Sequence, residues 1–197
     1  MLDHHPAAVL VNRRLDVYHV DAVLLADKEA ARAATQHLLR SGHRAVGFLA
    51  GPLTSYSSQQ RSKGYHTALA TAGVSLNPGW VRPCSYEVED GREAARALLS
   101  AHPELTALFC YNDLVAVGAL QACADLGRRV PDDLALVGFD DIPMAALVIP
   151  PLTTCHVPRY DLGDQAMRLL LRRVDGFAES CSEIVLPPEL VVRASAP

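Results

Sequence analysis

The chain has 197 residues, 18 basic and 22 acidic, and a formal net charge of −4. This length suits one domain or two small ones, and the acidic balance argues against a nucleic-acid-binding surface, which needs concentrated lysine and arginine. No apolar run could span a bilayer, and residues 1–6 lack the pattern of a secretory signal, so we expect a cytoplasmic protein without membrane contact.

Apolar strand-like runs alternate with helix-like segments along the chain. In chain order we expect strands at 8–11 and 20–25, a helix at 27–41, a strand at 45–50, helices at 59–72 and 87–100, a strand at 107–111, a helix at 113–126, a strand at 134–139, a helix at 160–174 and an extended segment at 184–193. Asp27 and Asp113 are expected to cap their helices. Short apolar strands between helices indicate an α/β fold with an open parallel sheet sandwiched by helices. The segment 140–158, with four prolines, is the expected crossover between lobes.

Polar residues follow several of these strands, where open sheets bind ligands. Asn12 follows the first strand, Ser57 and Arg61 follow the strand at 45–50, Asn112 follows the strand at 107–111, and Asp140 follows the strand at 134–139. Amide, carboxylate and guanidinium groups together suit a polyhydroxylated ligand. The histidines show no metal-ligand spacing and the five cysteines form no Cys-x-x-Cys pair, so we expect reduced thiols, no metal and no cofactor.

Six motifs occur in a fixed order and cover nearly the whole chain, at residues 42–52, 61–65, 111–118, 130–141, 150–154 and 186–193. The set resembles the LacI/GalR family of bacterial transcription regulators. The resemblance implies a periplasmic-binding-protein-like fold of two lobes with a small effector between them. It assigns residues 26–155 and 184–197 to a nearly complete C-terminal lobe, and residues 1–25 and 156–183 to a partial N-terminal lobe. In full-length members a helix-turn-helix head and the first half of that lobe come earlier, so operator DNA would be bound only through that head.

The resemblance also assigns roles to single residues. It implies effector contacts for Arg61, Asn112 and Asp140, and an aromatic stacking role for Tyr86. Simpler interpretations remain: Arg61 as a solvated surface charge, Asn112 as a helix cap (although Asp113 could serve instead), and Tyr86 as ordinary loop packing. A turn residue at Asn12 is the alternative to a binding role there, and Ser57 is a weaker candidate. Valine at 157, where some sugar-sensing members carry a polar residue, departs from the family pattern.

A homodimer is expected through the C-terminal lobe. The helix at 113–126 carries a second apolar stripe with Leu114, Val117 and Gln121, and the segment 143–149, with Leu147 and Val148, is unusually apolar for a loop. The resemblance places both near the twofold contact of family dimers. The alternative is that both pack inside one lobe.

We therefore predict the ligand-sensing and dimerisation module of a repressor that binds a sugar or related polyol. The alternative is the solute-binding protein of a sugar transporter, against which the lack of a secretory signal weighs. An enzyme could use Asp140 and Asp141 as an acid/base pair, but the sequence has no nucleophile elbow, P-loop or dinucleotide fingerprint, so no enzymatic activity is expected.

Overall fold

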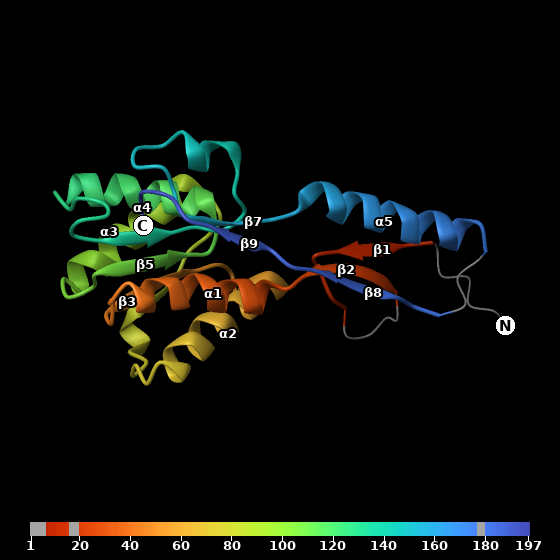
Figure 1. The fold of residues 1–197 in the computed structure, drawn as a ribbon, viewed down its shortest axis with the longest axis horizontal. Coiled ribbons are helices and arrows are strands. Elements are labelled where there is room, and N and C mark those ends of the chain that lie inside the picture. The colour runs from red at the N-terminus through yellow and green to blue at the C-terminus, as the bar shows by residue number, and fades with distance from the viewer. Residues whose placement is uncertain (1–6, 16–19, 177–179) are drawn as a thin grey trace.

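The computed structural model describes residues 7–15, 20–176 and 180–197, and Figure 1 shows two sheets following one another along the long axis. The first sheet has the parallel order β1-β2-β8, built from β1 (Val9–Val11), β2 (Asp21–Leu25) and β8 (Glu183–Leu186). The second has the parallel order β4-β3-β5-β6, built from β4 (Val81–Pro83), β3 (Val46–Ala50), β5 (Ala107–Cys110) and β6 (Ala135–Val137). The predicted parallel α/β architecture is confirmed.

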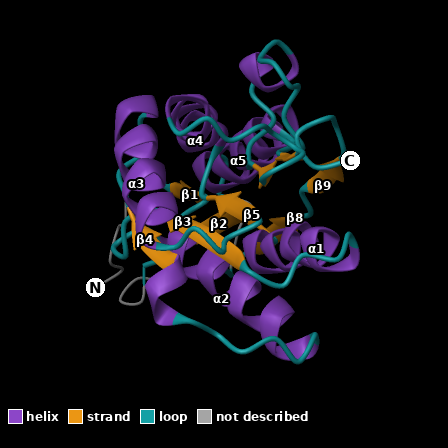
Figure 2. Cartoon of the chain, turned by 90° about the vertical axis from the view of Figure 1, so that its left-hand side faces the viewer, coloured by secondary structure: helices purple, strands orange, loops and turns teal. Residues whose placement is uncertain are grey.

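Helices cover both faces of the second sheet (Figure 2). On one face lie α1 (Asp27–Arg40) and α2 (Tyr56–Thr71), and on the other lie α3 (Val88–Ala101) and α4 (Asp113–Asp125). Because side chains alternate along a strand, Phe109 joins the core under α1 and α2 while Leu108 joins the core under α3 and α4. Two short 3-10 turns, Pro78–Trp80 and Pro143–Ala146, lie in the connections.

The first sheet is packed against α5 (Arg159–Val174). The buried Asp21 carboxylate accepts hydrogen bonds from the Arg173 guanidinium and from the Ser182 amide, at 2.6–3.0 Å. These bonds hold the start of β2, the end of α5 and the approach to β8 together. No helix among the described residues is long and apolar enough to cross a membrane.

The chain passes between the two sheets three times (Figure 1). It crosses after β2, then between β7 (Thr154–His156) and α5, and last between β8 and β9 (Glu189–Val191). Strands β7 and β9 form an antiparallel pair beside the second sheet, which the expectation of parallel pairing did not include. The predicted crossover at 140–158 therefore contains a strand, and the passage itself follows His156.

Three sequence-based assignments need correction. Residues 184–186 pair with β2 in the first sheet, so the lobe boundary predicted at 183/184 falls inside a strand. The segment 184–193 is not one extended element, because strand pairing is interrupted at Pro187 and Pro188, which cannot donate ladder bonds. Asp27 is the first residue of α1, whose cap position, Ala26, makes no side-chain cap. The cap of α4 is Asn112, not Asp113.

Candidate functional site

Arg61 is the centre of a buried polar network at the end of the second sheet that faces the first. Helix α2 begins after Ser55, whose hydroxyl accepts from the Ser58 amide, and places Arg61 in its second turn with 3% of the residue exposed. Its Nε donates to Asp27 Oδ1 at 2.8 Å and its Nη1 to the Tyr111 carbonyl at 2.6 Å. Its Nη2 lies 3.4 Å from Asp140 Oδ1. The alternative of a solvated surface charge at Arg61 is therefore wrong.

Aromatic rings enclose the guanidinium on its open sides. The Arg61 Cζ lies 3.5 Å from the centroid of the Phe139 ring and 4.7 Å from that of Tyr111, so cation–π attraction adds to the ion pairs. Burial raises the pKa of both the Asp27 and the Asp140 carboxyls, and the Arg61 charge opposes that rise. Asp27 Oδ2 is buried without a hydrogen-bond partner. The network thus holds one unsatisfied acceptor.

Asn112 links the network to the loop that carries Tyr86. Its Oδ1 accepts from the Val115 amide at 2.8 Å and caps α4, and its Nδ2 donates to the Tyr86 carbonyl at 3.2 Å. The helix-cap interpretation of Asn112 is therefore correct, and both ends of its amide are already engaged. The Tyr86 ring lies 5.5 Å from the Tyr111 ring at an interplanar angle of 50°.

Asp113, the residue after this cap, fixes the loop between β6 and β7. Its carboxylate accepts from the Thr154 hydroxyl and from the Ile142 amide. Burial raises the pKa of this carboxyl to about 7, and the neighbouring Asp140 and Asp141 charges act in the same direction. Asp113 is thus a structural residue whose charge changes near neutral pH.

The shift predicts a pH dependence of stability. Because the folded-state pKa of Asp113 lies above the ordinary aspartate value of 3.8, its contribution to stability is present below that value and is lost as pH rises to about 7. We expect the free energy of unfolding of the native chain, relative to an Asp113→Asn variant, to fall between pH 4 and pH 7 in urea titrations. A difference that stayed constant over this range would contradict the raised pKa.

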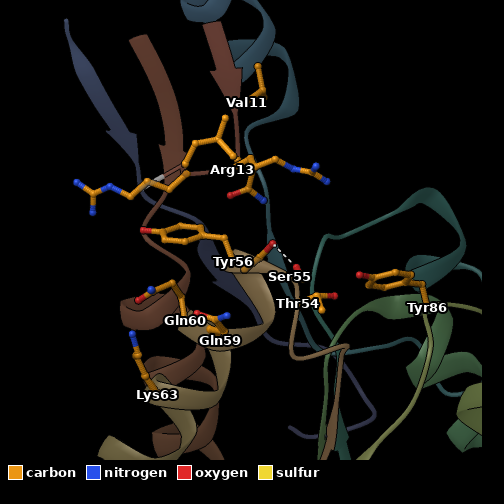
Figure 3. Close-up of a pocket in the computed structure, with 13 residues that line it drawn as sticks. Val11, Arg13, Thr54, Ser55, Tyr56, Gln59, Gln60, Lys63 and Tyr86 are labelled. Atoms are coloured by element: carbon orange, nitrogen blue, oxygen red, sulfur yellow. Dashed lines mark hydrogen bonds between the residues drawn. The ribbon is translucent and has the colours of Figure 1, made fainter. Parts of the chain in front are cut away.

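A pocket of about 760 Å³ opens beside this network, between the end of β1 and the start of α2 (Figure 3). Arg13 lies on one side, and Ser55 and Tyr56 lie on the facing side, with Tyr86 to one side (Figure 3). Asn12 and Ser57 also line the pocket. Asn12 has a positive φ of 49°, and its buried Oδ1 has no hydrogen-bond partner. Ser57 is buried, whereas Tyr86 is 38% exposed.

The predicted site residues thus fall into two adjoining groups. Arg61, Asn112 and Asp140 belong to the buried network, and Asn12, Ser57 and Tyr86 line the pocket. The contact between the Tyr86 and Tyr111 rings joins the groups, and the Asp140 side chain keeps 34% exposure. Val157, which departs from the family pattern, is buried in the core.

Sequence reasoning missed several residues of this region. Asp27 was expected only as a cap, although a carboxylate at the end of a strand is also the usual partner for a buried arginine. Arg13 and Gln59 line the pocket. They could have been found from the sequence because they lie close along the chain to the candidates Asn12 and Ser57. Nothing in the local sequence pattern indicated that the backbone carbonyl of Tyr111 accepts a hydrogen bond from Arg61.

The residues predicted for the dimer contact differ in exposure. Leu147 is 79% exposed and the nearby Ile149 is 93% exposed, whereas Val117 is only 8% exposed. Gln121 is exposed, and Leu114 and Val148 are partly buried. Val148 packs against the core under α3 and α4. The apolar surface therefore lies on the segment 143–149 more than on α4.

Two parallel sheets joined by three crossings, with a polar pocket where they meet, define a two-lobed ligand-binding protein. Residues 35–196 match the family described as "Periplasmic binding protein-like domain". The chain belongs to this family, and its relatives and structural neighbours place it with the effector-binding cores of the LacI type, which confirms the resemblance drawn from its motifs.

The curated relatives are repressors. The chain is 39% identical over 165 residues to the HTH-type transcriptional repressor PurR of Haemophilus influenzae, covering 82% of this chain and 49% of that protein. It is also 39% identical over 162 residues to the ribose operon repressor of the same species, with the same coverage. The chain therefore spans about half the length of the curated relatives it matches.

Solved structures agree. The transcriptional regulator CelR in complex with cellobiose superposes with a TM-score of 0.92 at 34% identity, over 95% of this chain and 58% of that one. The transcription regulator CcpA of Lactococcus lactis superposes with a TM-score of 0.88 at 30% identity, over 96% of this chain and 69% of that one.

Proposed function

We propose that this chain is the effector-sensing module of a LacI-type transcriptional repressor and that it binds a small sugar or related polyol between its lobes. The observation that carries the proposal is the pocket whose walls come from both lobes, Asn12 and Arg13 from one and Ser57 and Tyr86 from the other. An effector that contacts both walls favours one angle between the lobes. In the full-length protein that angle would set the spacing of the DNA-binding heads.

Within this proposal Asn12, Ser57 and Tyr86 contact the effector directly. The partly exposed carboxylate of Asp140 accepts hydrogen bonds from hydroxyl groups of the effector. Arg61 holds Asp140 and the Tyr111 backbone in place. Asn112 fixes the Tyr86 loop. The unpartnered Oδ1 of Asn12 supports a ligand hydroxyl at that position, because a buried acceptor without a donor costs stability.

Two other functions are less well supported. A transporter's solute-binding protein would share this fold, but the curated relatives named above are repressors. An enzyme using Asp140 and Asp141 would need both carboxyls to face one substrate. Asp141 is instead paired with His156 and Arg193, at 3.0 and 2.8 Å. A cytoplasmic location follows from the repressor function we propose.

Tyr86→Ala tests the proposed site. Loss of the aromatic face should weaken binding of the tightest sugar in a calorimetric panel of hexoses, pentoses and their phosphates by about tenfold. Because Tyr86 is partly exposed and its ring contacts only the Tyr111 ring among the described aromatic residues, the unfolding temperature should fall only slightly. The matched control is Tyr160→Ala, an 86% exposed tyrosine on α5. Equal affinity of the Tyr86→Ala variant and the native chain would remove Tyr86 from the site.

We further propose that two copies of the chain associate through the segment 143–149. Three exposed apolar side chains, Met144, Leu147 and Ile149, lie on it within six residues, and a patch of this kind on a monomer is costly in water. A twofold contact would place each patch against its own copy. In this arrangement Leu114, Gln121 and Val148 border the contact, whereas Val117 packs inside the lobe.

Leu147→Glu and Ile149→Glu test this dimer. Both side chains are exposed, so a charge should leave the fold intact and prevent association. We expect sedimentation velocity at micromolar concentration to show a dimer for the native chain and a folded monomer for each variant. A native chain that sediments as a monomer would contradict the dimer.

A further inference from the structure

The charge of the pocket differs from the charge of the chain. The chain carries 22 acidic and 18 basic residues, yet three basic residues, Arg13, Arg14 and Lys63, line the pocket. Among the described residues of the lining, none is an aspartate or a glutamate. A hollow lined by one sign of charge focuses the field and attracts the opposite charge. The positive charge gathered in one pocket of an acidic protein therefore bears on the charge of the ligand that this pocket attracts.

Most of this positive charge is not used inside the protein. Arg14 pairs with Glu183 at 2.9 Å, with both side chains largely exposed. No described carboxylate lies within ion-pair distance of Arg13 or Lys63. Both are exposed, Arg13 just beyond the end of β1 and Lys63 two turns into α2, so they reach the pocket from different lobes.

The rest of the lining suits a ligand that is also rich in hydroxyls. Thr54, Ser55 and Tyr56 bring hydroxyl groups to the start of α2, where the positive end of the helix dipole adds to the cations. The lining is thus both cationic and rich in hydroxyl groups.

We infer that the effector is an anionic sugar, phosphorylated or carboxylated. Its anionic group would be attracted by the positive charges of Arg13 and Lys63, and its hydroxyls would face Asn12 and the hydroxyl groups of the lining. The inference rests on the proposed effector-sensing function and narrows its ligand class. It also gives Arg13 and Lys63, one from each lobe, a direct role in sensing which lobe angle is adopted.

Calorimetric titration of the purified chain tests this. The probes are glucose 6-phosphate, ribose 5-phosphate and gluconate, their neutral parents glucose and ribose, and inorganic phosphate. We expect at least one anionic sugar to bind about tenfold or more tightly than its neutral parent, because a charge-assisted contact contributes that much. The preference should fall as salt is raised from 50 to about 500 mM.

Variants assign the effect to the pocket. In an Arg13→Gln/Lys63→Gln double variant the anionic preference should be lost while the affinity for the neutral parent is kept. Lys28→Gln, which removes the other lysine of the chain from an exposed position on α1, should bind as the native chain does. Circular dichroism melting should show all three proteins folded. A preference unchanged in the folded double variant would overturn the assignment.

The remaining outcomes separate the two proposals. If a neutral sugar binds as tightly as its phosphate, the anionic effector is wrong and the sensing function stands. If inorganic phosphate binds as tightly as any sugar phosphate, the pocket holds an adventitious ion only, and the inference is again overturned. If none of the probes binds, both the inference and the proposed sugar-sensing function are contradicted.

Discussion

Replacing Arg61 by methionine is expected to lower the free energy of unfolding by about 3–5 kcal/mol, since removing one partner of a buried ion pair leaves the other uncompensated. The Asp27 side chain is fully buried, and one of its oxygens already lacks a partner. The carbonyl of Tyr111 would lose its donor as well. Methionine fills much of the volume, so the loss would report on charge and hydrogen bonding more than on a cavity.

Urea titrations of a small set of variants would check this. Arg61→Met/Asp27→Leu should recover at least half of the lost stability, because the uncompensated carboxylate is gone. Arg168→Met removes one side of an exposed pair with Asp164 and should change stability by less than about 0.5 kcal/mol. If Arg61→Met were as stable as the native chain, the buried network would not exist in solution.

Gly118→Ala should destabilise the chain by about 1–3 kcal/mol, even though alanine is the better helix former. Helices α3 and α4 approach closely at this glycine. A Cβ on Gly118 would overlap the Val88 carbonyl oxygen and lie 2.6 Å from the Arg92 nitrogen. Both are backbone atoms of α3, so no side-chain movement relieves the clash and the two helices must separate.

Gly163→Ala is the matched control, because it is also a glycine inside a helix. No atom lies within 4 Å of a Cβ built there, so helix propensity alone should decide its effect. We expect Gly163→Ala to stabilise the chain by about 0.5–1 kcal/mol in the same thermal or urea titrations. Equal effects at the two positions would mean that α3 and α4 do not touch at Gly118.

The sequence predicted the fold well because its signals are local. The apolar run at 107–110 between two helical segments indicates a buried parallel strand, whatever its neighbours are. The split of 184–193 between two sheets could not be predicted in the same way. The pairing of Leu186 with Leu25 is a contact across most of the chain, and only the two prolines marked the interruption between the two strands.

The surroundings of the candidate site residues could be predicted only in part, for a similar reason. The types of residue at the strand ends identified Arg61, Asn112 and Asp140, but not what each one does. Arg61 bonds Asp27 across 34 positions and the Tyr111 carbonyl across 50, so its burial depends on contacts that the local pattern does not encode. Asn and Asp are both good helix caps, so the residue types did not decide between Asn112 and Asp113. The choice depends on which of the two residues has non-helical backbone angles.

Hydrogen–deuterium exchange with and without the tightest sugar of the calorimetric panel tests the central claim most directly. If the effector binds between the lobes, protection should increase at both walls of the pocket, around residues 11–15 from one lobe and around residues 54–60 and 86 from the other. The exchange of the central strand β5 should not change. Protection confined to one wall, or located away from this pocket, would contradict an effector site shared by the two lobes.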